Sequence, residues 1–253
     1  MCFISWGSHI KCLIMTKPIS QSHPEVTHLN WLVHRITTES LTRQLRRYAS
    51  GVLVDVGCGI KPYAQLTKGI VERHIGVDHS ETKHELSNID VIASCYDTTL
   101  SDGSADTVLC TFVLEHLERP HDALREIHRI LKPEGYLILG APLFWHLHEE
   151  PRDFYRYTKY GLAHLLAEAG FEVVEIQPLS GFIVTFSQEL CFYLEGFTGR
   201  LVRYPLNAVQ FLLQWVAYRL HHLGKDRATR FTWAYLAVAK KVSNSKGPED
   251  TKT

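Results

Sequence analysis

Two acidic residues and two glycines stand where two apolar segments of the chain end, and their spacing is suited to binding a nucleoside. Residues 52–56 form a short, mostly β-branched run interrupted by Asp55, which predicts a buried strand of a parallel sheet. Gly57 and Gly59 follow directly, where a strand has to turn and a ligand can approach bare backbone. A second apolar run ends at Asp78, 19 residues after Gly59. An acidic residue at this distance is placed to accept hydrogen bonds from ribose hydroxyls, so the pattern predicts a nucleoside site at the carboxyl ends of two strands.

The glycine turn differs from the dinucleotide-binding fingerprint, which has a third glycine where this chain has Pro62. Asp55 also brings a negative charge close to the turn, and this suits a cationic ligand better than a phosphate. The run Asp-Val-Gly-Cys-Gly at 55–59 resembles the first motif of the class I S-adenosylmethionine-dependent methyltransferases, an acidic residue, any residue, then Gly-x-Gly. Many members carry a further glycine where this chain has Lys61, and Gly-Ile-Lys-Pro-Tyr at 59–63 is similar to a variant of small-molecule members.

The resemblance extends along the chain and implies a set of cofactor contacts. The run Val-Leu-Glu-His-Leu at 113–117 resembles the segment that follows the fourth strand in this superfamily. The resemblance implies that S-adenosyl-L-methionine is bound, with Asp78 near the ribose, Asp97 near the adenine amino group and Asp55 near the amino-acid part. Each residue alone is more often part of a plain turn, but their combination favours the cofactor. The cofactor-binding residues predicted in this way are Asp55, Gly57, Cys58, Gly59, Asp78, Asp97 and Thr111.

The order of apolar runs and helical patterns predicts an α/β fold. We expect a Rossmann-like, doubly wound sheet of about seven strands, mostly parallel, plus a helical insertion before the last strand. The resemblance to the methyltransferases implies that this last strand is antiparallel. The predicted strands are 52–56, 71–77, 89–93, 106–112, 136–140, 171–176 and 231–239, the last ended by Lys240 and Lys241. The predicted helices are 24–50, 62–69, 120–131, 158–168 and two or three within 182–224.

The domain organisation predicted from these elements is simple. Residues 25–241 form a single methyltransferase domain with a helical cap insertion at about 182–224. Residues 1–24 are expected to be a flexible N-terminus, with Met15 as the favoured true start, and 242–253 a disordered tail.

The segment 141–158 is dense in aromatic and ionisable side chains, and it follows the fifth predicted strand, so it should hang over the same sheet edge as the glycine turn. A hydroxyl acceptor would need a base there, and the predicted catalytic residues are His148, Glu149 and His116. A structural role for His116 is about as plausible. His146 and His148 with three nearby carboxylates have metal-ligand character, but such residues are common in loops over clefts, and no metal is predicted. Cys58 is interpreted as a small filler of the turn rather than a nucleophile.

Composition narrows the functional classes. Lys plus Arg (27) equals Asp plus Glu (27), so no nucleic-acid partner is expected. The six cysteines are scattered without a Cys-x-x-Cys pair, which suits the reducing cytoplasm. No apolar run reaches the roughly 18 residues of a spanning helix. The Phe, Leu and Trp side chains of 206–223 are more often part of a core or cap than of a membrane face, but the basic flanks of 182–224 leave peripheral contact with an anionic lipid surface open as an alternative.

Taken together, the resemblance implies a methyltransferase (EC 2.1.1 type) acting on a small-molecule acceptor, such as a sugar or lipid-linked intermediate. The acceptor atom stays open between oxygen, nitrogen and carbon, and no motif fixes an oligomeric state. The alternative is a non-catalytic methyltransferase-like binding module that acts through its helical insertion. A nicotinamide-dependent oxidoreductase is disfavoured because the third glycine is missing.

Overall fold

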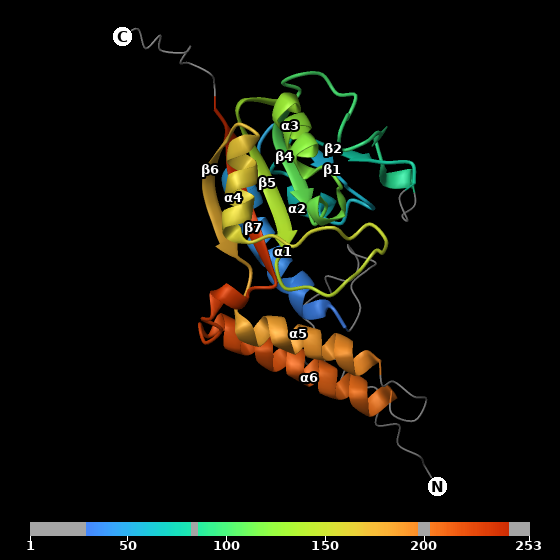
Figure 1. The fold of residues 1–253 in the computed structure, drawn as a ribbon, viewed down its shortest axis with the longest axis vertical. Helices are drawn as coiled ribbons and strands as arrows, with labels where there is room; N and C mark the ends of the chain where they lie inside the picture. Colours follow the sequence, from blue (N-terminus) through green and yellow to red (C-terminus); the bar gives the residue numbers. More distant parts are fainter. Residues whose placement is uncertain (1–28, 82–85, 197–202, 243–253) are drawn as a thin grey trace.

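Seven strands form a single sheet in the computed structural model, which describes residues 29–81, 86–196 and 203–242 (Figure 1). The strand order is β3-β2-β1-β4-β5-β7-β6, and every pairing is parallel except the two that β7 makes with its neighbours. The strands are β1 (Val52–Val56), β2 (Arg73–Asp78), β3 (Val91–Ile92), β4 (Ala105–Thr111), β5 (Leu131–Pro142), β6 (Phe171–Pro178) and β7 (Ala234–Lys241). The predicted fold class, with its antiparallel last strand, is confirmed.

Helices cover both faces of this sheet. They are α1 (Trp31–Tyr48), α2 (Ala64–Thr67), α3 (Pro120–Ile130), α4 (Lys159–Glu168), α5 (Phe182–Glu195) and α6 (Arg203–His222), with 3₁₀ turns η3 (Leu86–Asn88), η4 (Leu114–His116) and η5 (Thr229–Phe231). In Figure 1, α3 and α4 lie on one face and α1 on the other. The predicted N-terminus (1–24) and all but the first residue of the predicted tail (242–253) lie outside the described residues.

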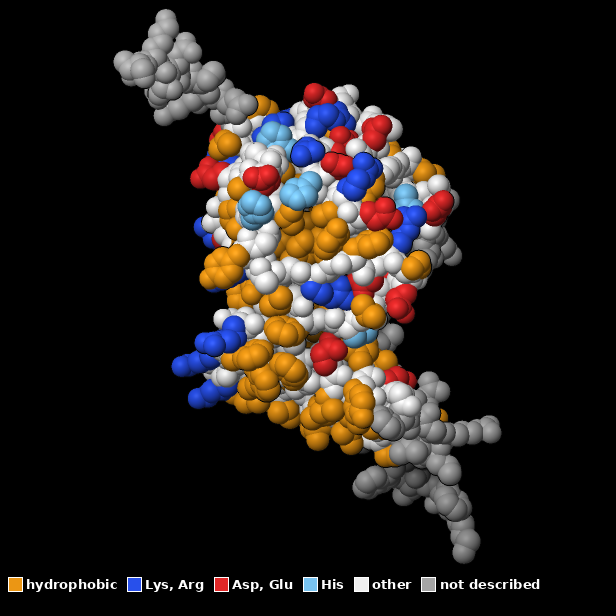
Figure 2. Space-filling view, viewed as in Figure 1, with side chains coloured by type: hydrophobic (Ala, Val, Ile, Leu, Met, Phe, Trp, Pro, Cys, Tyr) orange, Lys and Arg blue, Asp and Glu red, His pale blue; other side chains and the backbone are white. Residues whose placement is uncertain are grey.

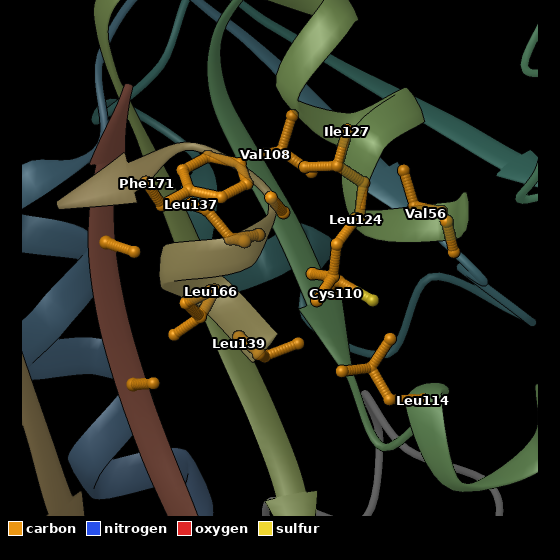
Figure 3. Close-up of a cluster of buried hydrophobic side chains, with 14 of the residues drawn as sticks. Val56, Val108, Cys110, Leu114, Leu124, Ile127, Leu137, Leu139, Leu166 and Phe171 are labelled. Atoms are coloured by element: carbon orange, nitrogen blue, oxygen red, sulfur yellow. The ribbon is translucent and has the colours of Figure 1, made fainter. Parts of the chain in front are cut away.

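Alternation along the strands produces two hydrophobic cores. Val54 and Val108 point to the cluster under α3 and α4, whereas their neighbours Leu53 and Leu109 belong to the cluster against α1. Figure 3 shows the first cluster, with side chains of α3 and α4 meeting those of β4 and β5. The central strands β1 and β4 and the second half of β5 are buried on both faces and mostly apolar, and this pattern makes them recognisable in the sequence. The strands β2 and β6 also carry polar residues.

The last strand differs from the prediction in its bounds. It begins later than expected and continues through Lys240 and Lys241, the residues that were expected to end it. The Lys241 ammonium donates to the carbonyl oxygens of His128 and Leu131, both at 2.7 Å, and Lys240 pairs with Glu134 at 2.5 Å. Both ammonium groups therefore have hydrogen-bond partners, and both lysines lie within β7, paired with its neighbouring strands.

The predicted insertion between β6 and β7 consists of α5 and α6, which lie side by side beyond the lower end of the sheet in Figure 1. Polar contacts fasten it to α1. The amide nitrogen of Leu32 donates to Gln214 Oε1 at 3.1 Å, and the Tyr218 hydroxyl donates to Glu39 Oε1 at 2.8 Å. None of the helices in the described part of the chain has both the length and the apolar character needed to cross a membrane.

Candidate active site

The glycine turn after β1 is bound to the neighbouring strand through its backbone. The amide nitrogens of Gly57 and Cys58 both donate to the carbonyl oxygen of Val77, at 2.9 and 3.2 Å. Gly57 has a φ of 72°, and a Cβ there would lie 2.4 Å from Val113 Cγ2. Both the left-handed backbone and the close approach of β4's following segment therefore require glycine at this position.

Asp78 connects the end of β2 to this turn. Its Oδ2 accepts a hydrogen bond from the amide of Gly59 at 2.7 Å, and its Oδ1 accepts one from His79 at 2.7 Å. The side chain is almost fully buried, yet it lines a cavity of about 580 Å³. A carboxylate can accept about four hydrogen bonds, so Asp78 retains acceptor capacity for a ligand hydroxyl while it holds the turn.

Asp55 and Cys58 are buried beneath the same turn. Asp55 Oδ2 lies 3.1 Å from His74 Nε2, and the other nitrogen of that ring lies 3.0 Å from Thr67 Oγ1. His74, a partner that the sequence did not reveal, therefore fixes the orientation of Asp55. Burial raises the pKa of the Cys58 thiol, which keeps it protonated and unreactive.

Two further predicted cofactor contacts have different surroundings. Thr111, the last residue of β4, lines a second cavity of about 250 Å³. Asp97 lines neither cavity; it is exposed, and its carboxylate accepts from the amide of Thr99 at 3.1 Å. A bridge between Ser94 and Asp97 reverses the chain there, so Ser94 and the next two residues line the larger cavity instead.

The two cavities adjoin each other and share lining residues from three segments. The shared residues are Gly57, Gly59, Phe112, His116 and Glu149. Phe112 and Glu149 have φ values of 58° and 53°, a left-handed conformation that costs on the order of 1–3 kcal/mol for such residues and is typical of functional sites. We refer below to the larger cavity, beside Asp78, and the smaller cavity, beside Thr111.

The three predicted catalytic residues lie at the junction of the cavities. The rings of His116 and His148 meet edge to face, with centroids 4.8 Å apart. His116 Nδ1 lies 2.6 Å from the carbonyl oxygen of Arg152. Burial lowers the pKa of His148, and neighbouring His116 adds to this effect, so His148 is neutral at pH 7. Glu149 is exposed at the mouth of both cavities.

Glu115 is a site residue that sequence reasoning missed. It precedes His116 in η4, lines the smaller cavity, and is only 1% exposed. Burial raises the pKa of its carboxyl to about 8, and its Oε2 has no hydrogen-bond partner. The residue stood in a recognisable run of the sequence, but nothing in that run distinguished a buried carboxyl from an exposed one.

The loop carrying His148 is clamped onto the sheet edge. Arg156 makes two bonds to the Asp153 carboxylate, at 2.6 and 2.8 Å, and also donates to the carbonyl oxygens of Trp145 and His146. The Tyr157 hydroxyl donates to the carbonyl oxygen of Leu114 at 2.9 Å. The loop and η4 therefore position their histidines against each other as one unit.

Comparison with solved structures defines the class of fold. A putative methyltransferase of Bacillus halodurans superimposes with a TM-score of 0.54 at 16% identity, covering 81% of this chain and 98% of that chain. At this identity the likeness concerns the fold alone, and it is the Rossmann-like fold of methyltransferases.

Comparison with sequence families then assigns the domain. Residues 54–139 match the family model described as a methyltransferase domain. The chain carries a class I S-adenosylmethionine-dependent methyltransferase domain, and S-adenosyl-L-methionine is the methyl donor of that class. The matched segment runs from β1 into β5, so it contains the glycine turn, Asp78 and η4 but not the loop with His148 or the α5–α6 insertion.

Curated relatives resemble the same part of the chain. The ubiquinone/menaquinone biosynthesis C-methyltransferase of Rubrivivax gelatinosus is 28% identical over 45% of this chain and 49% of its own length. A human thiol S-methyltransferase is 35% identical over 32% of this chain and 31% of its own length. The chain thus spans about half or less of the relatives it matches, and these relatives methylate different kinds of atom.

Proposed function

We propose that this protein is an S-adenosylmethionine-dependent methyltransferase that acts on a small-molecule acceptor. The observation that carries the proposal is the junction of the two cavities at the glycine turn and His116. The larger cavity offers the Asp78 carboxylate to a ribose, and Gly57 and Gly59 offer backbone that a ligand can approach. The smaller cavity, which Asp55 and Thr111 line, would hold the amino-acid end of the cofactor and, next to it on the side of Trp145, the acceptor.

The cofactor supplies, when bound, a methyl group that its sulfonium already makes electrophilic. The protein therefore has to align the acceptor and exclude water. Aromatic walls support this role, since Phe112 stacks on Trp233 at 5.0 Å between ring centroids and Trp145 contacts Trp233 at 5.1 Å. A hydroxyl acceptor would also have to lose a proton, and neutral His148 or Glu149 is placed to receive it.

Calorimetric titration with S-adenosylhomocysteine tests the cofactor half of the proposal. Replacing Asp78 by Ala removes hydrogen bonds from a charged acceptor, so affinity should fall about 10- to 100-fold. Asp102→Ala is the matched control, because the Asp102 side chain is 82% exposed and lines neither cavity. A wild-type protein that unfolds cooperatively but binds no S-adenosylhomocysteine would contradict the proposal.

A screen of acceptors with labelled donor tests the catalytic half. Methyl transfer to a sugar or a lipid-linked intermediate is the expected result, because the insertion brings an apolar surface close to the site. Cofactor binding without turnover of any acceptor class would instead favour the binding-module alternative, in which the chain acts through α5 and α6.

The outer face of the insertion supports a further part of the proposal, contact with an anionic membrane. Figure 2 shows apolar side chains gathered over α5 and α6, with Lys and Arg side chains at one end. The exposed apolar residues are Phe182, Phe186, Leu190, Tyr193, Val209, Phe211, Leu212, Trp215 and Val216, and the exposed basic residues near that end are Arg219, Lys225, Arg227 and Arg230. Apolar helices flanked by cations have the character of an interfacial lipid-binding surface.

Cosedimentation with vesicles tests this contact. Binding to phosphatidylserine-containing vesicles should exceed binding to pure phosphatidylcholine vesicles and should fall with salt. Leu212→Glu should weaken it severalfold, whereas Ile92→Glu, a similarly exposed residue on β3, should not. Equal effects of both variants, or a stable dimer that covers this face, would overturn the membrane assignment.

Four described cysteines (Cys58, Cys95, Cys110 and Cys191) are free, which agrees with a protein working on the reducing cytoplasmic side.

A further inference from the structure

Three potential metal ligands gather where the two cavities join. Glu115, His116 and His148 each present one ligand atom, and these atoms lie within 4.8 Å of one another. Two of the residues come from η4 and the third from the loop after β5, so the trio exists only in the folded chain. Two imidazoles and one carboxylate form a donor set that suits divalent first-row transition metals and leaves coordination positions open.

The orientation of His116 suits a ligand role. Its Nδ1 lies 2.6 Å from the carbonyl oxygen of Arg152, and a carbonyl oxygen can only accept, so Nδ1 carries the proton. Nε2 then has the free lone pair, and it lies 3.9 Å from Glu115 Oε1. Histidine ligands of metals usually donate a hydrogen bond from the nitrogen that does not bind the metal to an oxygen atom, and this bond fixes the tautomer.

The two other members contain buried atoms that no protein group satisfies. Glu115 Oε2 and His148 Nδ1 are both buried, and neither has a hydrogen-bond partner in the described structure. The nearest anion to His148 Nδ1 is Asp153 Oδ2 at 3.5 Å, and that carboxylate is already engaged by Arg156. Unsatisfied buried polar atoms are uncommon, so two of them in one three-residue cluster point to a ligand shared by the cluster.

The cluster differs from the metal-ligand set considered for the sequence. In the structure His146 Nδ1 lies 3.5 Å from Glu189, and Asp153 is paired with Arg156. Of that set, only His148 joins the trio, together with two residues from η4. The expectation of no metal rests on residues of the loop alone, whereas this cluster joins the loop to η4.

We propose that Glu115, His116 and His148 bind one divalent transition-metal cation, with Zn²⁺, Co²⁺ or Mn²⁺ as suitable ions. Metal–ligand distances of about 2.0–2.2 Å require the three ligand atoms to close in from their present separation, which side-chain rotation provides. The cation would sit at the wall of the smaller cavity, which all three residues line.

The role of this cation rests on the proposed function, although its binding does not. An acceptor hydroxyl that completes the coordination would lose its proton more easily. Its oxygen would then form a bond to the methyl carbon while the carbon–sulfur bond breaks with its electron pair left on sulfur. The released proton would pass to Glu149, which lines both cavities, and from there to water. The two histidines would thus hold the cation, and Glu149 would be the base.

Titration with CoCl₂ tests the proposal directly. The full-length protein is stripped with a chelator, and binding is followed by the visible absorption of Co²⁺ and by calorimetry with ZnCl₂. One equivalent should bind. Glu115→Gln and His148→Gln should each weaken binding about 100-fold or more, since loss of a ligand should exceed the 10- to 100-fold effect of losing an outer partner. His146→Gln, in the same loop but paired with Glu189, is the matched control and should bind as the wild type does.

S-adenosylhomocysteine binding, measured on the same samples, separates this proposal from the proposed function. Cofactor binding without Co²⁺ or Zn²⁺ binding would overturn the metal site alone, and metal binding without cofactor binding would overturn the function alone. Equal losses in the His146 variant and the ligand variants would assign the cation to surface histidines. If Glu115→Gln is poorly folded, His116→Gln serves as the second ligand variant.

Discussion

The cofactor side of the junction is made largely of backbone, whereas the facing side is made of side chains from distant parts of the chain. On the cofactor side, the turn at Gly57 bonds to β2 through main-chain atoms, and Asp78 bonds to a main-chain amide. On the facing side, Glu115 and His148 meet because η4 and the loop after β5 fold together. The local sequence determines the backbone geometry of a turn, whereas an assembly of side chains from distant segments depends on tertiary packing. The cofactor side is therefore recognisable in a sequence, and the facing side is not.

The largest effect should come from a substitution that fills the turn. Gly57→Ala places a Cβ 2.4 Å from Val113 Cγ2 in a left-handed backbone, so S-adenosylhomocysteine binding should become undetectable by calorimetry. Gly69→Ala has a similar φ of 75° but no heavy atom within 4 Å of the new Cβ. It should cost about 1 kcal/mol of stability and leave the affinity unchanged. Equal losses of affinity would mean that backbone strain, not close approach, governs the cofactor side.

The second effect concerns the facing side and depends on pH. The Glu115 pKa is raised by burial from 4.5 to about 8 in the folded state, so the folded protein binds an extra proton between these values. The contribution of this group to stability should therefore be fully present below pH 4.5 and be lost as pH rises from there through 8, by up to a few kcal/mol. Urea unfolding with a chelator present measures this. Glu115→Gln should remove this decline and be the more stable protein at pH 8; a wild-type curve that rises over this range would refute the assignment.

The contrast between the two sides also explains which site residues were predictable. The positions of the turn and Asp78 follow from the spacing of glycine and carboxylate along two strands, and the structure places them together. Asp97 was inferred by resemblance to lie near adenine, yet the bridge to Ser94 turns it towards solvent. The chain reverses its direction between Ser94 and Asp97, and such a short turn within a loop produces no periodic pattern in the sequence.

Other features were hidden because they depend on distant partners. His74 orients Asp55 from the adjacent strand, 19 residues away. Lys61 replaces a family glycine, and the structure gives it a φ of 53° and an ion pair with Asp90, so it keeps the glycine-like backbone while its side chain is used elsewhere. The fold itself was predictable, since strands buried on both faces and amphipathic helices repeat regular patterns along the chain.

A third effect would loosen the loop that carries His148. Arg156→Lys keeps the charge but loses the two-pronged contact with Asp153, whose side chain is only 2% exposed. Stability should fall by about 1–3 kcal/mol, and affinity for S-adenosylhomocysteine should stay within about twofold. Arg125→Lys is the control, because its partner Asp122 is on the surface and the change should be nearly neutral. A large loss of cofactor affinity in the Arg156 variant would show that the two sides are coupled.

The smallest effect tests a single bond between the loop and η4. Tyr157→Phe keeps the ring but removes the hydroxyl that donates to the buried carbonyl of Leu114, so unfolding in urea should show a loss of about 1–2 kcal/mol. Tyr155→Phe removes a similar bond, to the carbonyl of Glu118, but that side chain is 40% exposed and water can replace the partner. The loss should therefore be limited to the Tyr157 variant. If the Tyr157 bond also positions the metal ligands, Co²⁺ affinity should fall severalfold in this variant, whereas cofactor affinity should not change. This difference would show that metal binding on the facing side is independent of cofactor binding at the glycine turn.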